Sequence, residues 1–266
     1  MVIILIYWFA SISSNNTVFI KEIENMVILR VEKLGQMLIN IIPMLFTLMT
    51  ISFKGASMKY VFDYIESGNK DSIENFILLS GSARRADLLS FLNPQICKVN
   101  IDERAIEKHY MEKYKNEDFI HRVGMTCCQI SRGKSIIDMD NNTMYISADT
   151  MVVMDDQIYN KPRNLSEARQ MFLSYFGKSH HVVTSVCLKM RGYENTFYTI
   201  AEVEFVSYYE ELSSVINEYL KEENVMDKAG AYGIQDLDPR FVKRISGDIN
   251  TIIGLPVAEV AYRISK

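Results

Sequence analysis

Two periods of hydrophobic and polar residues alternate along the chain from Phe76 onward, and each predicts a different kind of element. Short apolar runs typical of buried strands occur in "NFILLS" (75–80), "QICKVNI" (95–101) and "TMYISADTMVVMDDQIY" (143–159). The last run predicts one strand, a crossing point at 148–150, and a second strand that ends in a turn at 155–156.

Apolar residues at helical spacing predict four helical regions, over 83–92, 102–136, 164–177 and 210–223. The region over 164–177 has the clearest boundaries. Asn164 or Ser166 can cap its start, and Gly177 stands where a C-terminal glycine belongs.

The second half of the chain continues the alternation. Segments 180–190 and 196–208 read as paired strands around "RGYEN", with His180 and His181 on opposite faces of the first. Short strands are expected at "AYGI", "RFVKRI" and "TIIGL", followed by a terminal helix from Pro256. Because strands and helices alternate without internal repeats, the pattern predicts one α/β domain over 76–266.

Residues 1–75 form an N-terminal extension of different character. The apolar segments "MVIILIYWFASI" and "MLINIIPMLFTLM" are shorter than the roughly 20 residues that a spanning helix needs. Three interpretations stay open: a signal or anchor segment, an extra packed helix, or upstream sequence translated in error. Met58 would be a sensible alternative start in the third case, and only the first would bring the protein to a membrane.

The net charge and the cysteine spacing argue against two classes of protein, nucleic-acid-binding proteins and zinc proteins. The 266 residues carry a formal net charge of −4, so no global field favours nucleic acid, and a polyanion would need a local cluster of Lys and Arg. The four cysteines lack the spacing and paired histidines of a zinc site. We therefore expect free thiols in a reducing compartment, which favours a cytoplasmic location.

The stretch "SGSARRADLL" joins a predicted strand to a predicted helix. Such a junction directs backbone N–H groups and the positive end of the helix to one point. Ser80 and Ser82 add hydroxyl groups, and Arg84 and Arg85 add planar cations suited to phosphate oxygens. Cations there oppose the helix dipole, so the pair indicates an anion nearby; the alternative is that both arginines are solvated first-turn residues.

Two further segments carry candidate chemistry. Asp149 ends an apolar run, where a half-desolvated carboxylate can act as a base or bind a cation, and Lys161 precedes a proline that would steady it. In "DKAGAYGIQ", close glycines predict tight bends, and Gln235 could present its amide to a base edge. The alternatives are a strand-end Asp, a turn Lys and a compact structural loop.

These segments, in this order, resemble the Maf family of nucleoside triphosphate pyrophosphatases. The motifs are "LSGSARRADLL", "SADTMVVMDDQIYNKP", "GKSHHVVTSV", "DKAGAYGIQ" and "FVKRISGD…IIGLP". The resemblance implies a single α/β domain with a twisted mixed sheet and a cleft between two lobes. It also implies hydrolysis of a nucleoside triphosphate between the α and β phosphates, a divalent cation that is usually Mg²⁺, and often a homodimer.

The resemblance also implies roles for individual residues. Asp149 falls on the catalytic acidic position, and Glu103 on an acidic position near the site that is suited to the metal. Other matched positions line the triphosphate site: Ser82, Arg85, Lys134 and Lys161. Arg84, Thr150 and Gln235 match the branch of the family that acts on dTTP and UTP rather than 7-methyl-GTP.

Three positions depart from the family pattern. Ala83 replaces a usual proline, Asn224 a common glutamate and Thr251 a common asparagine. Losing a carboxylate at Asn224 removes a possible proton acceptor or cation ligand. The leading hypothesis is therefore an active pyrophosphatase for dTTP, UTP or modified pyrimidine nucleotides. The alternative is a catalytically weakened nucleotide-binding regulator on the same fold.

Overall fold

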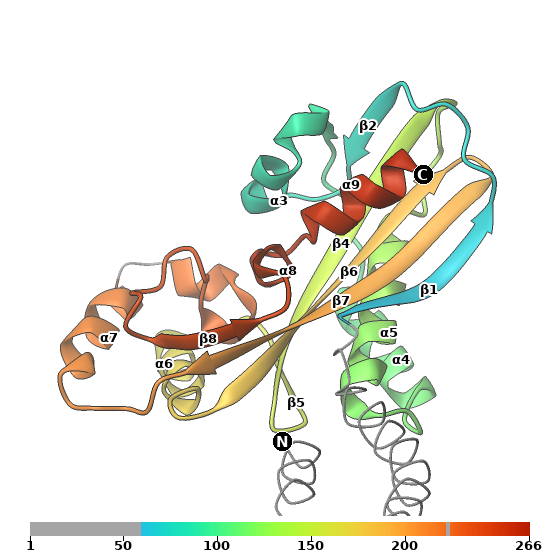
Figure 1. Cartoon of the computed structure of the whole chain (residues 1–266). Coiled ribbons are helices and arrows are strands. Elements are labelled where there is room, and N and C mark those ends of the chain that lie inside the picture. Colours follow the sequence, from blue (N-terminus) through green and yellow to red (C-terminus); the bar gives the residue numbers. More distant parts are fainter. Residues whose placement is uncertain (1–59, 222–223) are drawn as a thin grey trace, which may run out of the picture. The chain divides into compact units, whose positions relative to one another are not determined.

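The computed structural model describes residues 60–221 and 224–266 (Figure 1). Residues 60–266 make one compact unit. The predictions for the apolar segments before Met58 lie outside the described residues. Within the described part, no helix combines the length and apolar character needed to cross a membrane.

An open, mixed eight-stranded sheet forms the centre of the domain, with the order β1-β7-β6-β4-β2-β3. β5 pairs with β4, and β8 pairs with β7. β2 runs parallel to β3 and β4, and the other pairs are antiparallel. The strands are β1 Val61–Gly68, β2 Asn75–Leu78, β3 Gln95–Ile96, β4 Thr143–Met154, β5 Gln157–Tyr159, β6 Ser179–Met190, β7 Tyr193–Phe205 and β8 Val242–Ser246.

β4, β6 and β7 run the length of the domain and twist as they go (Figure 1). Nearly all of their residues are buried, because helices and loops cover both faces of the sheet. The β4–β5 turn has Asp155 and Asp156 at φ 49° and 55°, the backbone of a tight two-residue hairpin, as predicted for 155–156.

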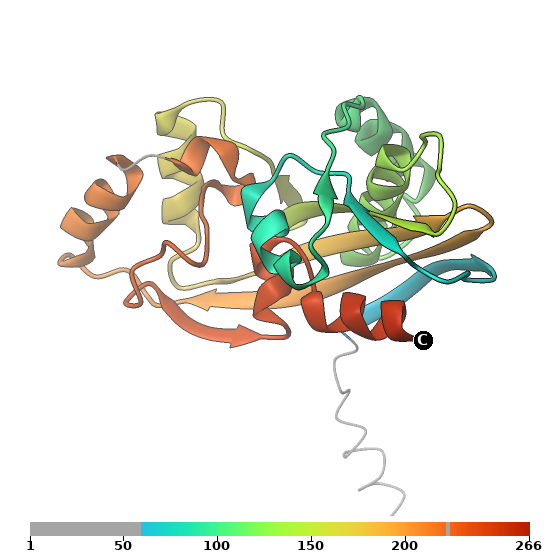
Figure 2. The same cartoon turned by 90° about the horizontal axis from the view of Figure 1, so that it is seen from above.

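Helices cover the sheet in three groups, each with its own apolar cluster. α6 and α7 gather at one end of the long strands, α4 and α5 lie on one face, and α3 and α9 flank β2 and β4 (Figures 1 and 2). The α-helices are α3 Ala83–Leu88, α4 Glu103–Lys113, α5 Phe119–Lys134, α6 Leu165–Ser174, α7 Leu212–Lys221, α8 Ile249–Ile253 and α9 Val257–Ser265. Short 3₁₀ helices are η1 Ser90–Leu92, η2 Asn224–Asp227 and η3 Ala229–Ala231.

Most predicted elements are confirmed at their expected places. Asn164 is the cap of α6, since its Oδ1 accepts from the Glu167 backbone N–H at 2.9 Å, and Gly177 beyond the helix has φ 75°. β6 and β7 pair throughout, and the terminal helix follows Pro256.

Several predictions are wrong. β4 continues through 148–150 without a crossing point, since Ala148, Asp149 and Thr150 keep their register with β6. The first three residues of "TIIGL" belong to α8 and Gly254 follows the helix, because the Asp248 side chain caps a helix there by accepting from Asn250 N–H. "AYGI" is not a strand: it runs from the last residue of η3 to the start of a turn at Ile234. Only two residues of "QICKVNI" pair as a strand.

β1 extends the sheet beyond the start expected at Phe76. Its residues pair antiparallel with β7 from Val61 to Gly68. The register shifts between Asp63 and Ile65, which breaks the two-residue alternation by which a strand is recognised in a sequence.

Candidate active site

A cavity of about 860 Å³ opens where the loop before α3, the start of α4, the middle of β4 and the segment after α7 meet. It is large enough for a small-molecule ligand. All of the site residues predicted from the sequence line it: Ser82, Arg84, Arg85, Glu103, Lys134, Asp149, Thr150, Lys161 and Gln235.

The loop before α3 is built as the sequence predicts, with a strand leading into a helix. Ser82 caps α3, its Oγ 3.5 Å from the Arg85 backbone N, and its own N–H donates to Ser80 Oγ at 3.2 Å. Ala83 begins the helix and is exposed. Figure 2 shows this loop and α3 beside the α8–α9 segment, far away in sequence.

Arg85 joins these distant segments. Its Nε donates to the Gly254 carbonyl at 2.9 Å, Nη1 to the Ala148 carbonyl at 2.9 Å and Nη2 to Thr150 Oγ1 at 3.0 Å. Burial lowers the pKa of this guanidinium, and the charge of Asp149 opposes the change. Arg85 thus lines the cavity, but each of its three nitrogens has a protein partner. Gly254, with φ 123°, brings its carbonyl to this arginine.

Thr150 belongs to a hydrogen-bond chain whose direction can be assigned. The Thr184 hydroxyl donates to the Thr251 carbonyl at 2.7 Å, so the Thr150 hydroxyl, 2.9 Å from Thr184 Oγ1, must donate to Thr184. Thr251 Oγ1 in turn lies 2.8 Å from Thr199 Oγ1. The threonine at the departing position 251 is therefore fully buried and hydrogen-bonded.

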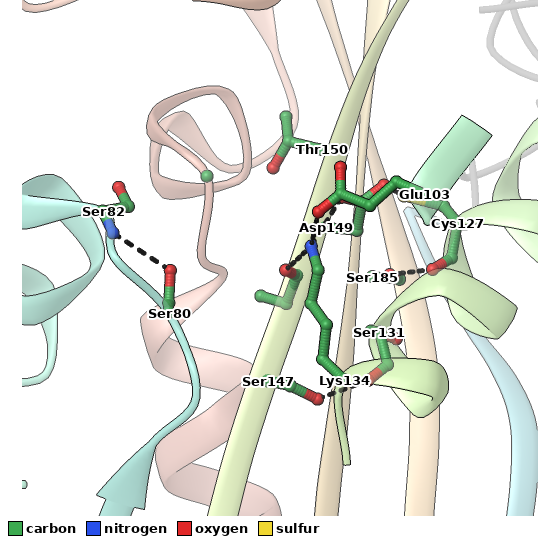
Figure 3. A network of polar contacts seen from close by, with 12 residues as sticks. Ser80, Ser82, Glu103, Cys127, Ser131, Lys134, Ser147, Asp149, Thr150 and Ser185 are labelled. Carbon is green, nitrogen blue, oxygen red and sulfur yellow. Dashed lines mark hydrogen bonds and ion pairs between the residues drawn. The ribbon is translucent and has the colours of Figure 1, made fainter. Parts of the chain in front are cut away.

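Glu103, Lys134 and Asp149 form what we call the bridged centre (Figure 3). Lys134 Nζ donates to Asp149 Oδ1 at 3.0 Å and to the Ala148 carbonyl at 3.2 Å, and it forms an ion pair with Glu103 Oε1 at 2.9 Å. Asp102 caps α4 and thereby makes Glu103 the first residue of that helix. Lys134 and Asp149 are each 7 % exposed.

Cys127 on α5 contacts Asp149, and the sequence did not predict it as a site residue. Its Sγ lies 3.3 Å from Asp149 Oδ2, and the side chain is fully buried. Burial, then the neighbouring Asp149 charge, raises the pKa of this thiol well above its ordinary value. A buried cysteine on an apolar helix face resembles a core residue in sequence, so nothing there distinguished it.

Arg84, Lys98 and Lys161 line the same cavity and are here called the open cations. Among the described residues none of them has a hydrogen bond or ion pair to a protein group. Pro162, directly after Lys161, is buried, whereas Lys161 itself is exposed. Lys98 was not predicted; a single lysine in the segment after β3 gives no signal in sequence.

The segment with close glycines, residues 227–235, forms another wall of the cavity. Gly230 has φ 72°, and a Cβ there would lie 2.6 Å from the Tyr175 hydroxyl, so the close approach requires glycine. The Gly233 N–H donates to the Tyr219 hydroxyl at 3.1 Å, and Lys228 Nζ pairs with Asp236 Oδ2 at 2.9 Å. Gln235 is exposed within this turn. Lys228 is a further lining residue that the sequence did not single out.

His180 lies behind that wall and is completely buried. Its Nε2 is 2.6 Å from the hydroxyl of Tyr232, which lines the cavity. Burial lowers the pKa of His180 to about 3, so the ring is neutral. His181 faces the other way, 3.9 Å from Glu202, which confirms that the two histidines point to opposite faces.

The chain is similar to proteins of known activity over most of its length. A family model described as Maf-like protein matches residues 75–266. Three relatives are named dTTP/UTP pyrophosphatase. That of Bacillus cytotoxicus is 31 % identical over 73 % of this chain and 96 % of its own length. Those of Vibrio cholerae and Bacillus velezensis are 32 % and 34 % identical, over 73 % and 70 % of this chain and 99 % and 93 % of their own lengths. The chain belongs to the Maf-like protein family.

Proposed function

We propose that this chain is a nucleoside triphosphate pyrophosphatase that hydrolyses dTTP or UTP to the monophosphate and pyrophosphate. The observation that carries the proposal is one cavity holding both a buried carboxylate–lysine centre and three cations without protein partners. The names of its relatives support the choice of nucleotide.

Asp149 would act on the attacking water. Its Oδ1 accepts from Lys134 and its Oδ2 from Cys127, and because each carboxylate oxygen has more than one lone pair, acceptor capacity remains toward the cavity. The water oxygen bonds to the α-phosphorus, its proton passes to Asp149, and the bond from that phosphorus to the α–β bridging oxygen breaks. Pyrophosphate leaves with the bonding electrons.

The open cations would hold the triphosphate. Arg84, Lys98 and Lys161 have donors free for phosphate oxygens, and their charge opposes the negative charge that develops on pyrophosphate. Arg85 would hold the loop and β4 in place, since its guanidinium is already bonded to both.

A divalent cation fits the bridged centre. The carboxylates of Glu103 and Asp149 both contact one cation, the Lys134 ammonium group, so the two side chains lie as a pair that can share a positive charge. Among the described residues no group of three or more His, Cys, Asp or Glu side chains could hold a metal ion by itself. The two carboxylates would therefore have to share the ion with phosphate oxygens and water, which is the usual ligand set of Mg²⁺ in phosphate sites. Glu103 and Asp149 would hold it. When bound, the ion would neutralise charge on the phosphates.

Base selection would involve Gln235 directly and Thr150 indirectly. Gln235 is exposed at the cavity wall with its amide free among the described residues, whereas the Thr150 hydroxyl proton is committed to Thr184. Thr150 would therefore act by orienting Arg85.

We also propose that the protein works in the cytoplasm and as a homodimer. All four cysteines, including exposed Cys97, are free thiols, which supports a reducing compartment. The dimer is proposed only from the family resemblance. Size-exclusion chromatography with light scattering, together with fractionation of cells, would test both.

The test of the proposed function is a product assay. The full chain is incubated with Mg²⁺ and a panel of nucleoside triphosphates, and pyrophosphate and orthophosphate are measured separately. We expect pyrophosphate from dTTP and UTP. A folded protein that binds dTTP by calorimetry but releases no pyrophosphate would instead indicate the nucleotide-binding regulator.

A further inference from the structure

The side chain of Cys127 makes a hydrogen bond to the carboxylate on which the proposed reaction depends. Its Sγ is 3.3 Å from Asp149 Oδ2 and 3.9 Å from the Val183 carbonyl, so the carboxylate is its nearer acceptor. In this contact the thiol is the donor and Asp149 Oδ2 is the acceptor.

Cys127 and Lys134 approach the carboxylate from one face of α5. They are seven residues apart, about two helical turns, so both project from the same side of the helix. Lys134 Nζ donates a hydrogen bond to Asp149 Oδ1, and Cys127 Sγ donates one to Asp149 Oδ2. A carboxylate with a donor on each oxygen has a fixed rotation about its last side-chain bond.

Serine hydroxyls fix α5 against the sheet around this contact (Figure 3). Ser185 Oγ on β6 donates to the Cys127 carbonyl at 2.7 Å, and Ser147 Oγ on β4 donates to the Ser131 carbonyl at 2.6 Å. Ser147 lies two residues before Asp149, so it shares the face of β4 that carries the carboxylate. The helix and strand therefore keep a fixed separation, and the thiol stays at its distance from Asp149.

We propose that Cys127 is a positioning residue for the pyrophosphatase reaction. Its thiol holds Asp149 Oδ2, so that the remaining acceptor positions of the carboxylate face the cavity and the attacking water. This inference rests on the proposed function. Neither the net charge of the centre nor substrate contacts change when this thiol is removed, so its loss affects turnover rather than binding.

The test compares Cys127→Ala and Cys127→Ser with Cys128→Ala. Cys128 is the matched control, because it is equally buried on the next residue of α5 and makes no side-chain hydrogen bond to Asp149. Kinetics with dTTP and Mg²⁺ are measured after denaturant unfolding shows each variant folded. We expect kcat of Cys127→Ala to fall about tenfold with KM within about twofold, as loss of a charge-assisted hydrogen bond implies. Cys127→Ser keeps a donor of shorter reach, so its kcat should lie between those of Cys127→Ala and the unsubstituted chain. The kcat of Cys128→Ala should equal that of the unsubstituted chain.

Two kinetic results would overturn the proposal while leaving the proposed function standing. One is equal kcat for Cys127→Ala and the unsubstituted chain when the latter releases pyrophosphate. The other is an equal loss in Cys128→Ala, which would assign the effect to core packing.

An infrared measurement separates the contact from the activity. The S–H stretching band that is lost in Cys127→Ala and kept in Cys128→Ala belongs to this thiol. It should shift when Asp149 is changed to Asn, whatever the protein hydrolyses. An unshifted band would show that the thiol does not donate to Asp149 and would reject the inference. Absence of pyrophosphate release by the unsubstituted chain would instead reject the proposed function.

Discussion

The bridged centre and the open cations line the same cavity but differ in how their charges are balanced. Lys134 is 7 % exposed and lies within 3.2 Å of three protein oxygens, two of which belong to carboxylates. Arg84, Lys98 and Lys161 have no such partner within residues 60–221 and 224–266. Balanced, buried charges fix geometry, whereas unbalanced, accessible charges are available for a ligand. We therefore assign chemistry to the bridged centre and ligand binding to the open cations.

The largest effect should come from the bridged centre itself. Asp149→Asn removes the proton acceptor but keeps a side chain of the same shape, and kcat with dTTP should fall about 10³-fold, within the usual range for a general base. Steady-state pyrophosphate release measures it. Asp155→Asn, in the β4–β5 turn at φ 49°, is the control, since asparagine tolerates that backbone. Wild-type turnover in Asp149→Asn would show that the general base is not in the bridged centre.

The second prediction concerns stability and the buried His180, which belongs to neither the bridged centre nor the open cations. Burial lowers the pKa of His180 to about 3, against an ordinary value of 6.5. Between these values the unfolded chain binds a proton that the native chain does not. The free energy of unfolding should therefore fall as pH drops from 6.5 towards 3, by up to about 1.4 kcal/mol per pH unit.

Denaturant unfolding at several pH values checks the histidine prediction. His180→Gln should lose this part of the pH dependence, while His181→Gln, the partly exposed neighbour, should keep it. Parallel pH curves for the unsubstituted chain and His180→Gln would show that another group causes the acid sensitivity.

Lys161→Ala tests the open cations. Because this lysine has no protein partner to lose, the substitution should leave unfolding unchanged, and KM for dTTP should rise about tenfold. Raising the salt concentration should increase KM less in Lys161→Ala than in the unsubstituted chain, since one screened contact is gone. Lys178→Ala, whose partner is Asp155 at 2.7 Å outside the cavity, serves as the control. A changed unfolding midpoint with an unchanged KM would reverse the assignment.

The smallest effect is expected at Lys228, which lines the cavity like the open cations but has an ion-pair partner like Lys134. Lys228 lines the cavity but pairs with Asp236, whose side chain is 54 % exposed. Asp236→Asn would convert Lys228 into a fourth open cation and should change KM for dTTP by no more than about threefold, because the carboxylate that it loses is half exposed to solvent. Asp238→Asn, whose partner is Arg240, is the matched control. A loss of kcat in Asp236→Asn would place this pair in the chemistry.

The sequence predicted β6, β7, the order of the helices and the lining residues, because each depends on a local pattern or motif. It did not predict β4 as one strand, since a crossing point was expected at 148–150. β1 escaped prediction because its register shift disturbs the alternation, and "TIIGL" was wrong because β-branched residues favour a strand where a capped helix forms. The partners of Arg85 could not be predicted, since Gly254 lies 169 residues away and meets it only through the fold. Cys127 and Lys98 lacked any distinguishing pattern.

Calorimetric titration of Asp149→Asn with dTTP, in the presence of a chelator so that no metal contributes, tests the division of roles most directly. The open cations are intact in this variant, and a negative charge has been removed from a site for a polyanion. We predict that the variant binds dTTP at least as tightly as the unsubstituted chain while releasing no measurable pyrophosphate when Mg²⁺ is restored. Loss of dTTP binding together with turnover would contradict the separation of binding from chemistry in this cavity.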